Sequence, residues 1–482
     1  MTIKDLTPAI VWNNFYKITR NPRPSKHEEI IRAFLLKWAE EHDIKAFTDE
    51  TGNVIMTVPA TPGYENRKGV ILQGHMDMVP QKNSDVKHDF LTDPIETKVE
   101  GDWLKACGTT LGADNGLGLA LAMSVAESTD VPHGPIEILA TYDEETGMTG
   151  AANLKPGILK GDILINLDSE TEGELYVGCA GGLDASAEGK YELEAAPAAY
   201  KTFNFAVKGC QGGHSGMDIV LYRANANRVA ARVLLGLLET GLVKLVDLEG
   251  GTLRNAIPRE CFATILVKDA AAVAGKLETL ASELKSEYAE TDPDMQFVLE
   301  PAEAAAPKCA TDADALRIVN AILACPDGVE RMSASVENLC ETSTNLAMVG
   351  MKDGKWFVKS LLRSSVDTAK MALAARMKAV FDLAGASIKF TGAYSGWKPN
   401  PNSTILKVMK EVYLRKFGKE PKVMAIHAGL ECGILSGAYP HWDMVSCGPT
   451  ILSPHSPDER TYIPSIAIVW EYLKEVLANI PE

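Results

Sequence analysis

Short apolar runs alternate with longer helical stretches between about residues 68 and 170. Three runs have the length of a strand and few polar positions: GVILQG (69–74), IEILATYD (136–143) and ILINLD (163–168). The stretch NGLGLALAMSVAES (115–128) is longer, rich in Ala, Leu and Met, and typical of a buried helix. Strands that are apolar throughout are buried on both faces, so the pattern predicts an α/β fold with a mostly parallel sheet flanked by helices.

Two clusters of Gly, Pro, Asn and Ser interrupt this pattern and predict the domain organisation. They read GCAGGLDASAEG (178–189) and GAYSGWKPNPNS (392–403), and they resemble hinges. A chain of 482 residues is also longer than one hydrophobic core usually supports. We therefore expect a discontinuous first domain, residues 1–186 and 394–482, and an inserted α+β domain, residues 187–393.

The insert contains two segments with the same order of elements. Residues 253–300 and 345–391 each read as a strand, a long amphipathic helix and a strand, which suggests a degenerate duplication of a βαβ-type unit. After the second cluster the pattern returns to helix, in STILKVMKEVYLRKFG (403–418) and then VMAIHAGLECGIL (423–435). A Pro-rich loop and a last helix follow.

Composition and charge narrow the class of protein. Hydrophobic residues make up 46% and charged residues 23% of the chain, and the net charge of −16 disfavours nucleic acid and anionic membrane surfaces as partners. No apolar run reaches the roughly 20 residues that cross a bilayer, and the N-terminus lacks a signal-peptide core, so we expect a cytoplasmic protein. The nine cysteines have no regular spacing and are expected to be reduced core residues.

The candidate chemistry lies where the predicted strands end. The first run leads into His75 and Asp77, the second ends at Asp143-Glu144-Glu145, and the third ends at Asp168. In open α/β sheets ligands gather at the carboxyl ends of the strands. The sequence therefore predicts one histidine and several carboxylates along one edge of the sheet.

His75 and Asp77 are two positions apart in extended chain and project to the same side. This spacing suits a metal-bound imidazole whose other ring nitrogen is held by a carboxylate. A polar strand end explains the same residues. Taken alone, the pair does not decide between the two interpretations.

Asp114 stands in the sequence LGADNG, at the start of the predicted helix. It could cap that helix within a turn, or bridge two metals between close-approach glycines. The glycine spacing does not match a dinucleotide-binding loop. For the acidic pair, the alternatives are a solvated turn and a division of labour in which Glu145 binds a metal while Glu144 acts as a base on water.

Further candidates lie outside the strand ends. His455 stands between two prolines in SPHSPDER, which suits a preorganised ligand, and His214 stands in the glycine-rich GCQGGHSGMD of the insert. Asn255 and Arg363 are donors of the kind that hold a peptide carbonyl or a terminal carboxylate. Ordinary surface or structural roles are expected for His27, His42, His88, His133 and His441.

Taken in order, these motifs resemble those of the co-catalytic zinc metallopeptidases, and in particular the bacterial cytosolic aminoacyl-histidine dipeptidases, also called Xaa-His or carnosine-splitting dipeptidases. The resemblance covers nearly the whole chain. It rests on HMD (75–77), GADNG (112–116), DEETG (143–147), NLDSE (166–170), GGHSG (212–216), RNAIP (254–258), GWKPNPNS (396–403), HAGLECG (427–433) and SPHSPDE (453–459).

The resemblance implies a site with two Zn²⁺ ions per chain, for which Mn²⁺ or Co²⁺ could substitute. It implies His75, Asp114 and Asp168 on one ion, and Asp114, Glu145 and His455 on the other. By the same resemblance Asp77 orients His75 and Glu144 is the general base acting on a water shared by the two ions. The first domain is then the catalytic di-metal domain and the insert its lid.

For the lid, the resemblance implies that His214 stabilises the oxyanion and that Asn255 and Arg363 bind the substrate, a small peptide. Related di-zinc tripeptidases, carboxypeptidases and N-acyl amino acid deacylases use the same ligands and remain alternatives, as does a non-catalytic metal-dependent binding protein. Relatives often form dimers, so a homodimer is also open. The large insert offers the other possibility, that one chain supplies what a partner lid provides elsewhere.

Overall fold

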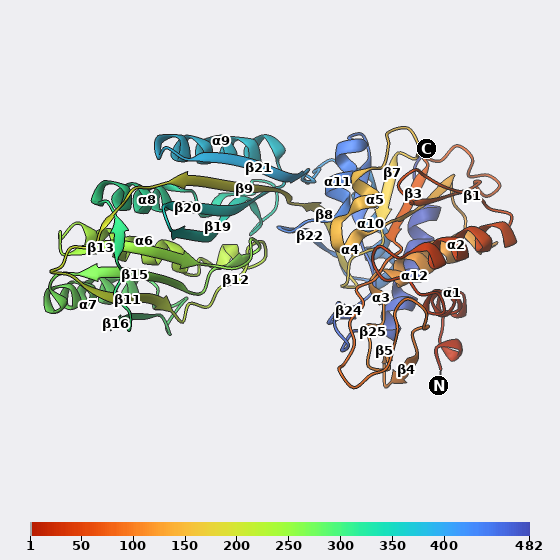
Figure 1. Cartoon of the computed structure of the whole chain (residues 1–482). Coiled ribbons are helices and arrows are strands. Elements are labelled where there is room, and N and C mark those ends of the chain that lie inside the picture. Colours follow the sequence, from red (N-terminus) through yellow and green to blue (C-terminus); the bar gives the residue numbers. More distant parts are fainter. Residues whose placement is uncertain (1) are drawn as a thin grey trace. The chain divides into compact units, whose positions relative to one another are not determined.

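The computed structural model describes residues 2–482 (Figure 1). The chain forms two compact units. Unit 1 comprises the residues up to Gly178 together with Trp397–Ala425 and Leu430–Glu482, and unit 2 comprises Cys179–Gly396 and Ile426–Gly429. Each unit has its own hydrophobic core.

The unit boundaries differ from those expected from the sequence. The expected junction at 186/187 falls inside strand β9 (Gly181–Lys190), which pairs with β20 (Lys355–Ser364) along its whole length. Because these backbone hydrogen bonds tie all of β9 into unit 2, that unit begins at Cys179. The loose Gly and Ser composition of 178–189 therefore marks the start of a strand as well as a linker.

Unit 1 is built on an eight-stranded sheet. Its strands lie in the order β1 (Lys45–Thr48), β2 (Val54–Val58), β6 (Ile136–Thr141), β3 (Val70–His75), β7 (Ile163–Asn166), β23 (Asp443–Ser446), β8 (Glu174–Cys179) and β22 (Lys422–Ile426). The central pairs β6–β3, β3–β7 and β7–β23 are parallel, whereas β1–β2, β2–β6 and β23–β8 are antiparallel. The fold class expected from the apolar runs is confirmed.

The long helices of unit 1 bury their apolar faces in its core. They are α1 (Ala9–Thr19), α2 (Glu29–Glu41), α3 (Ala113–Glu127), α10 (Thr404–Phe417) and α12 (Ile463–Ala478). Helix α3 packs against both α1 and β3, and the side chains from Leu117 to Val125 are all buried. This burial on all sides explains why 115–128 has no polar face in the sequence.

Shorter elements complete unit 1. The helices α4 (Glu144–Gly147), α5 (Thr149–Ala152) and α11 (Glu431–Ala438) follow strands of the main sheet, and a small sheet has the order β24 (Ile451–Leu452), β25 (Arg460–Tyr462), β5 (Trp103–Ala106) and β4 (Thr97–Glu100). The helical expectation for 423–435 is wrong in its first half. Val423–Ile426 belongs to β22, and the helix begins only at Glu431.

Unit 2 is built on a nine-stranded sheet. Its main path is β16 (Gln296–Pro301), β11 (Lys201–Lys208), β15 (Cys261–Val267), β13 (Val243–Gly250), β19 (Cys340–Lys352), β20, β9 and β21 (Ser387–Tyr394), and β18 (Gly328–Met332) pairs with β19. Its helices are α6 (Ala226–Leu238), α7 (Ala270–Glu287), α8 (Asp312–Ala324) and α9 (Asp367–Leu383). Two small ladders pair β10 (Leu193–Ala195) with β17 (Lys308–Ala310) and β12 (Gly213–His214) with β14 (Ala256–Ile257).

The two similar segments of the insert adopt the same arrangement. Strands β15 and β16 lie on either side of β11 and are both antiparallel to it, and α7 connects them. Strands β20 and β21 lie on either side of β9 in the same way, and α9 connects them. Each segment is thus a split βαβ unit, with its two strands parallel to each other across a middle strand.

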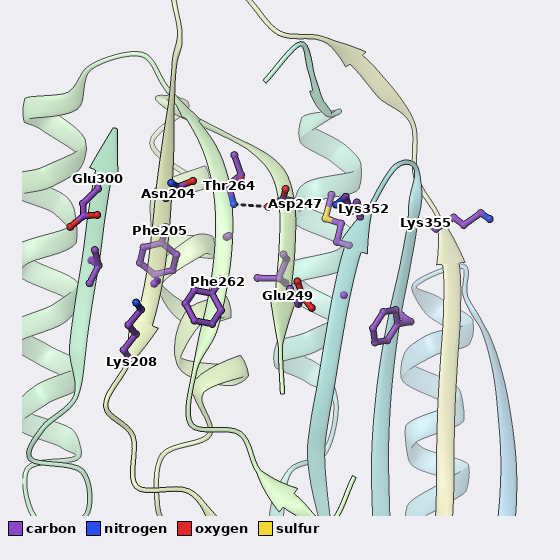
Figure 2. A pocket seen from close by; sticks show the side chains of 17 residues that line it. Asn204, Phe205, Lys208, Asp247, Glu249, Phe262, Thr264, Glu300, Lys352 and Lys355 are labelled. Atoms are coloured by element: carbon purple, nitrogen blue, oxygen red, sulfur yellow. Dashed lines mark hydrogen bonds between the residues drawn. The ribbon is translucent and has the colours of Figure 1, made fainter. Parts of the chain in front are cut away.

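One face of this sheet carries a shallow hollow of about 750 Å³. Figure 2 shows the labelled side chains that line it, among them Lys208, Glu249 and Phe262, with helices behind the strands. Acidic and basic side chains line it together with the exposed Phe262 ring. Among the residues that the structure describes, the lining of this hollow includes no site residue predicted from the sequence.

Candidate metal centre

The topology of unit 1 explains why the candidate residues meet. Strand β3 lies between β6 and β7 and runs parallel to both, so the three carboxyl ends share one edge of the sheet. His75 is the last residue of β3, Glu144 and Glu145 open α4 after β6, and Asp168 follows β7. Asp114 lies in the first turn of α3 with non-helical dihedral angles.

His75 is buried and contacts three carboxylates. Its Nε2 atom lies 2.9 Å from Oδ1 of Asp114 and 3.4 Å from Oδ1 of Asp168, and its Nδ1 atom lies 3.2 Å from Oδ1 of Asp77. Asp77 lies beside Nδ1, and the second ring nitrogen, Nε2, faces Asp114 and Asp168. This is the arrangement expected of an imidazole held by a carboxylate on one side and a cation on the other.

His455 approaches the same carboxylate from the loop between β24 and β25. Its Nε2 atom lies 3.2 Å from Oδ2 of Asp114 and 3.0 Å from Oε2 of Glu145. The two oxygens of Asp114 therefore face two different imidazoles. One oxygen belongs to a group with His75 and Asp168, and the other to a group with His455 and Glu145.

The donor atoms fit divalent ions. Ligand atoms around one tetrahedral Zn²⁺, at roughly 2.0–2.2 Å from the ion, are separated by about 3.3 Å. The distances from the two Nε2 atoms to the carboxylate oxygens span 2.9–3.4 Å. In addition, Oδ1 of Asp168 is buried and has no hydrogen-bond partner, and such an atom requires a cation or a donor.

The electrostatics of these side chains favour positive charge at both positions. Burial lowers the pKa of His75, but Asp168, Asp114 and Asp77 raise it well above its usual value. Hydrogen bonds to Asp114 and Glu145 raise the pKa of His455 to about 11. A raised pKa means that the surroundings of each imidazole stabilise a positive charge. The site therefore has two positions that favour a cation.

The acidic pair is held by the carboxylate that also orients His75. The backbone N–H groups of Glu144 and Glu145 donate to Oδ1 and Oδ2 of Asp77, at 3.0 and 3.2 Å. Burial raises the pKa of Glu144 well above its usual range, and Asp168, Glu431 and Glu145 add to this effect. A carboxylate with a raised pKa suits a group that accepts and releases a proton near neutral pH.

Three supporting residues were not predicted from the sequence. Glu459 is buried, and its carboxylate accepts the N–H groups of Leu111, Gly112 and Asp114 at 2.7, 3.0 and 3.2 Å. The buried Arg23 donates to the carbonyl oxygens of Met76, Asp77 and Gly112, and so joins the same loop to the end of β3.

The third residue is Glu431, which lies 1% exposed beneath the edge of the sheet. It accepts hydrogen bonds from Gln73 and Thr141 at 2.6 and 2.8 Å. Burial raises its pKa to about 7. Both acidic residues stand in quoted motifs, Glu459 in SPHSPDE and Glu431 in HAGLECG, but their spacing alone gives no indication of what they contact.

The remaining candidates gather in unit 2. Nδ1 of His214 accepts the N–H groups of Gly216 and Met217, at 3.3 and 3.2 Å, so the neutral ring carries its hydrogen on Nε2. Burial and the charge of Arg363 lower the pKa of His214. Nε of Arg363 lies 3.4 Å from Oγ of Ser215, whose N–H donates to the carbonyl oxygen of Asn255 at 2.8 Å.

Comparisons with known proteins show which proteins this chain is similar to. The chain is 45% identical over 488 residues to the cytosol non-specific dipeptidase of Escherichia coli (strain K12), with 99% of each chain covered. A crystal structure of aminoacylhistidine dipeptidase from Vibrio alginolyticus matches with a TM-score of 0.97 and 45% identity, covering 100% of this chain and 99% of that one.

More distant relatives share the fold. The aminopeptidase PepT structure from Bacillus cereus ATCC 10987 has a TM-score of 0.58 at 17% identity, covering 99% of this chain and 100% of the other. The description of peptidase family M20/M25/M40 matches residues 71–479, which include all the candidate metal ligands. With the metallopeptidase resemblance of its motifs thus confirmed, the chain belongs to peptidase family M20/M25/M40.

Proposed function

We propose that this protein is a metal-dependent dipeptidase that hydrolyses small peptides, preferentially Xaa-His dipeptides such as carnosine. The observation that carries the proposal is the carboxylate of Asp114, whose two oxygens face His75 and His455 separately. An anion shared between two imidazoles, each completed by a further carboxylate, suits a pair of divalent ions.

In this proposal Asp114 would hold both of two Zn²⁺ ions, one together with His75 and Asp168 and the other together with Glu145 and His455. Bound there, divalent ions would lower the pKa of water and polarise the scissile carbonyl group. Mn²⁺ or Co²⁺ could substitute, because mixed histidine and carboxylate sites bind all three.

Glu144 is the proposed general base. Its carboxylate takes a proton from the attacking water and gives it to the leaving amine, and its raised pKa suits both transfers. Asp77 has two positioning roles, because it faces Nδ1 of His75 and accepts the N–H of Glu144. A structural zinc site would need no such unligated carboxylate, which argues against the alternative of a non-catalytic binding protein.

The proposal gives three residues of unit 2 a role in binding the peptide. His214 presents an Nε2–H group, the form that donates to the oxyanion of a tetrahedral intermediate. Arg363 is assigned to the substrate carboxylate, which guanidinium groups recognise with two parallel hydrogen bonds. Asn255 is exposed and is assigned to a peptide carbonyl.

Support for the substrate class comes from relatives. The Vibrio alginolyticus structure is of an aminoacylhistidine dipeptidase, and the Escherichia coli relative is a non-specific dipeptidase of the cytosol. We accordingly propose a cytoplasmic enzyme; no helix within residues 2–482 is long and apolar enough to cross a bilayer. Tripeptidase, carboxypeptidase and deacylase activities are the alternatives, because the metal ligands serve any amide.

A substrate screen tests the proposal. The full chain, loaded with Zn²⁺, Mn²⁺ or Co²⁺, is assayed on Xaa-His dipeptides, other dipeptides, tripeptides and N-acyl amino acids, with and without chelator. We expect Xaa-His dipeptides to have the highest kcat/KM and chelator to abolish hydrolysis. Faster hydrolysis of tripeptides or N-acyl amino acids would show that the proposed substrate class is wrong and that one of the alternatives is right. Sedimentation of the same preparation decides between a monomer and the homodimer left open by the sequence.

A further inference from the structure

A second group of buried carboxylates lies behind the acidic pair. One oxygen each from Glu28, Asp77 and Asp143 lies within 4.8 Å of the other two, and all three side chains are buried, Glu28 and Asp77 completely. Three negative charges this close and out of contact with water repel one another strongly. The group requires either a cation or a proton.

The hydrogen bonds of the group leave one oxygen without a partner. Asp77 receives the two N–H groups of the acidic pair and faces Nδ1 of His75. Asp143 accepts the hydroxyl groups of Thr146 and Thr149, one on each oxygen.

Glu28 is different, because only one of its two carboxylate oxygens accepts hydrogen bonds. Oε1 accepts the N–H groups of Lys26 and Asp143, at 3.1 and 3.0 Å. Oε2 is buried and has no hydrogen-bond partner. The unmatched group in the cluster is therefore a single oxygen of a single side chain.

One carboxylate oxygen without a hydrogen-bond partner can carry a proton, but it cannot by itself form a metal site. Hard cations take six to eight oxygen ligands, or six in near-ideal octahedral geometry for Mg²⁺, and here the other carboxylate oxygens already accept hydrogen bonds. A protonated carboxyl group at Glu28 would instead supply the donor that the cluster lacks. Two carboxyl groups that share one proton are a familiar solution to such crowding.

We propose that Glu28 is a protonated carboxyl group that donates a hydrogen bond from Oε2 to the carboxylate of Asp77, and that it is a positioning residue for the turn carrying Glu144 and Glu145. Through Oε1 it accepts the N–H of Asp143, the residue before the acidic pair. Asp143 has a φ of 52°, which is uncommon for residues other than glycine. Through Oε2 it bonds the carboxylate that orients both His75 and the acidic pair.

The charged and titratable groups around Glu28 agree with this assignment. Asp77 and Asp143 face it from the ends of β3 and β6. Tyr142 interacts with the charge of Glu28, and the guanidinium group of Arg32 lies over the Tyr142 ring. Burial, followed by the charge of Asp77, raises the pKa of Glu28 to about 7. No basic side chain among the described residues donates to its carboxylate.

Infrared spectroscopy tests the proton directly. Difference spectra are recorded at pH 6 between the metal-loaded wild-type chain and Glu28→Gln, with Glu29→Gln as the matched control because Glu29 is the exposed neighbour. We expect the carbonyl band of a protonated carboxyl group to disappear in Glu28→Gln and to remain in Glu29→Gln. Identical bands in wild type and Glu28→Gln would overturn the proposal.

Kinetics and metal content test the positioning role, which rests on the proposed function. Glutamine keeps both a donor and an acceptor, so kcat of Glu28→Gln should exceed that of Glu28→Ala by about tenfold. Equal losses in the two variants, or a third divalent ion that is bound by the wild type and lost in Glu28→Gln, would overturn it. The spectra need no substrate, so failure of the dipeptidase proposal would leave the proton test intact.

Discussion

Nε2 of His455 lies 3.2 Å from Oδ2 of Asp114, although 341 positions separate the two residues in the sequence. The other oxygen of Asp114 lies 2.9 Å from Nε2 of His75. If Asp114 binds both metals, removing its charge should disturb both, whereas removing His455 should disturb one. This difference separates a bridging carboxylate from one that serves a single ion.

We therefore expect Asp114→Asn to retain far less than one metal per chain after dialysis, and His455→Ala to retain about one of about two. Elemental analysis of dialysed protein measures both. Asp130→Asn is the control, because Asp130 is exposed. If Asp114→Asn retains both metals, the carboxylate of Asp114 does not bridge two ions in the wild type.

Glu144→Gln should keep its metals and lose activity. The amide preserves the size of the side chain but cannot accept the proton of water, and general base catalysis typically contributes roughly 10²–10⁴-fold. We expect kcat to fall within this range on the preferred dipeptide, with metal content unchanged. Glu411→Gln is the control, because Glu411 is an exposed glutamate of the same unit. Normal hydrolysis by Glu144→Gln would exclude it as the base.

His214→Ala should lower kcat with little effect on bound metal. Loss of one oxyanion donor typically lowers kcat by roughly 10²–10³-fold, and KM should change less. His441→Ala provides the control, because this histidine is exposed and belongs to unit 1. If metal is lost instead, His214 is a ligand and its proposed role is wrong.

The strand ends were predictable because they follow from local pattern. Uninterrupted apolar runs indicate buried parallel strands, and parallel neighbours place His75, Glu145 and Asp168 at one edge. His455 follows from no such rule, since its loop approaches the edge through the small sheet of β24 and β25. Its candidacy came from the stiff SPHSP sequence and from the family resemblance.

The supporting residues were not predictable for a related reason. Glu459 acts on backbone N–H groups some 345 positions away, and Arg23 on carbonyl oxygens more than 50 positions away. Backbone groups carry no sequence information, so nothing in the pattern identifies their partners. Val423–Ile426 was misread for a tertiary reason as well, because an apolar run that short is a strand or a helix according to its neighbours.

Glu459→Gln should weaken metal binding without removing a ligand. The amide accepts fewer of the hydrogen bonds from Leu111, Gly112 and Asp114, so the loop that presents Asp114 is held less firmly. Changes of this kind typically lower metal affinity by roughly 10–100-fold. Competition with a chelator measures the affinity, and the exposed neighbour Asp458→Asn is the control. Equal affinities in the two variants would show that the loop needs no anchor.

Protonation of Glu28 predicts a specific dependence of stability on pH. The pKa of Glu28 is about 7 in the folded chain, against an ordinary value of 4.5. Between these values the folded state holds the proton and the unfolded state has released it. The stabilisation is therefore complete below pH 4.5 and is lost as pH rises through 7.

Glu28→Gln has no such proton, so its stability should change less over the same range. We expect the free energy of unfolding of the wild type, relative to Glu28→Gln, to fall by on the order of 2–3 kcal/mol between pH 4.5 and pH 8. Urea unfolding at matched metal content measures this difference. Because the other titrating groups are common to both proteins, a difference that stays constant with pH would mean that folding leaves the pKa of Glu28 unchanged.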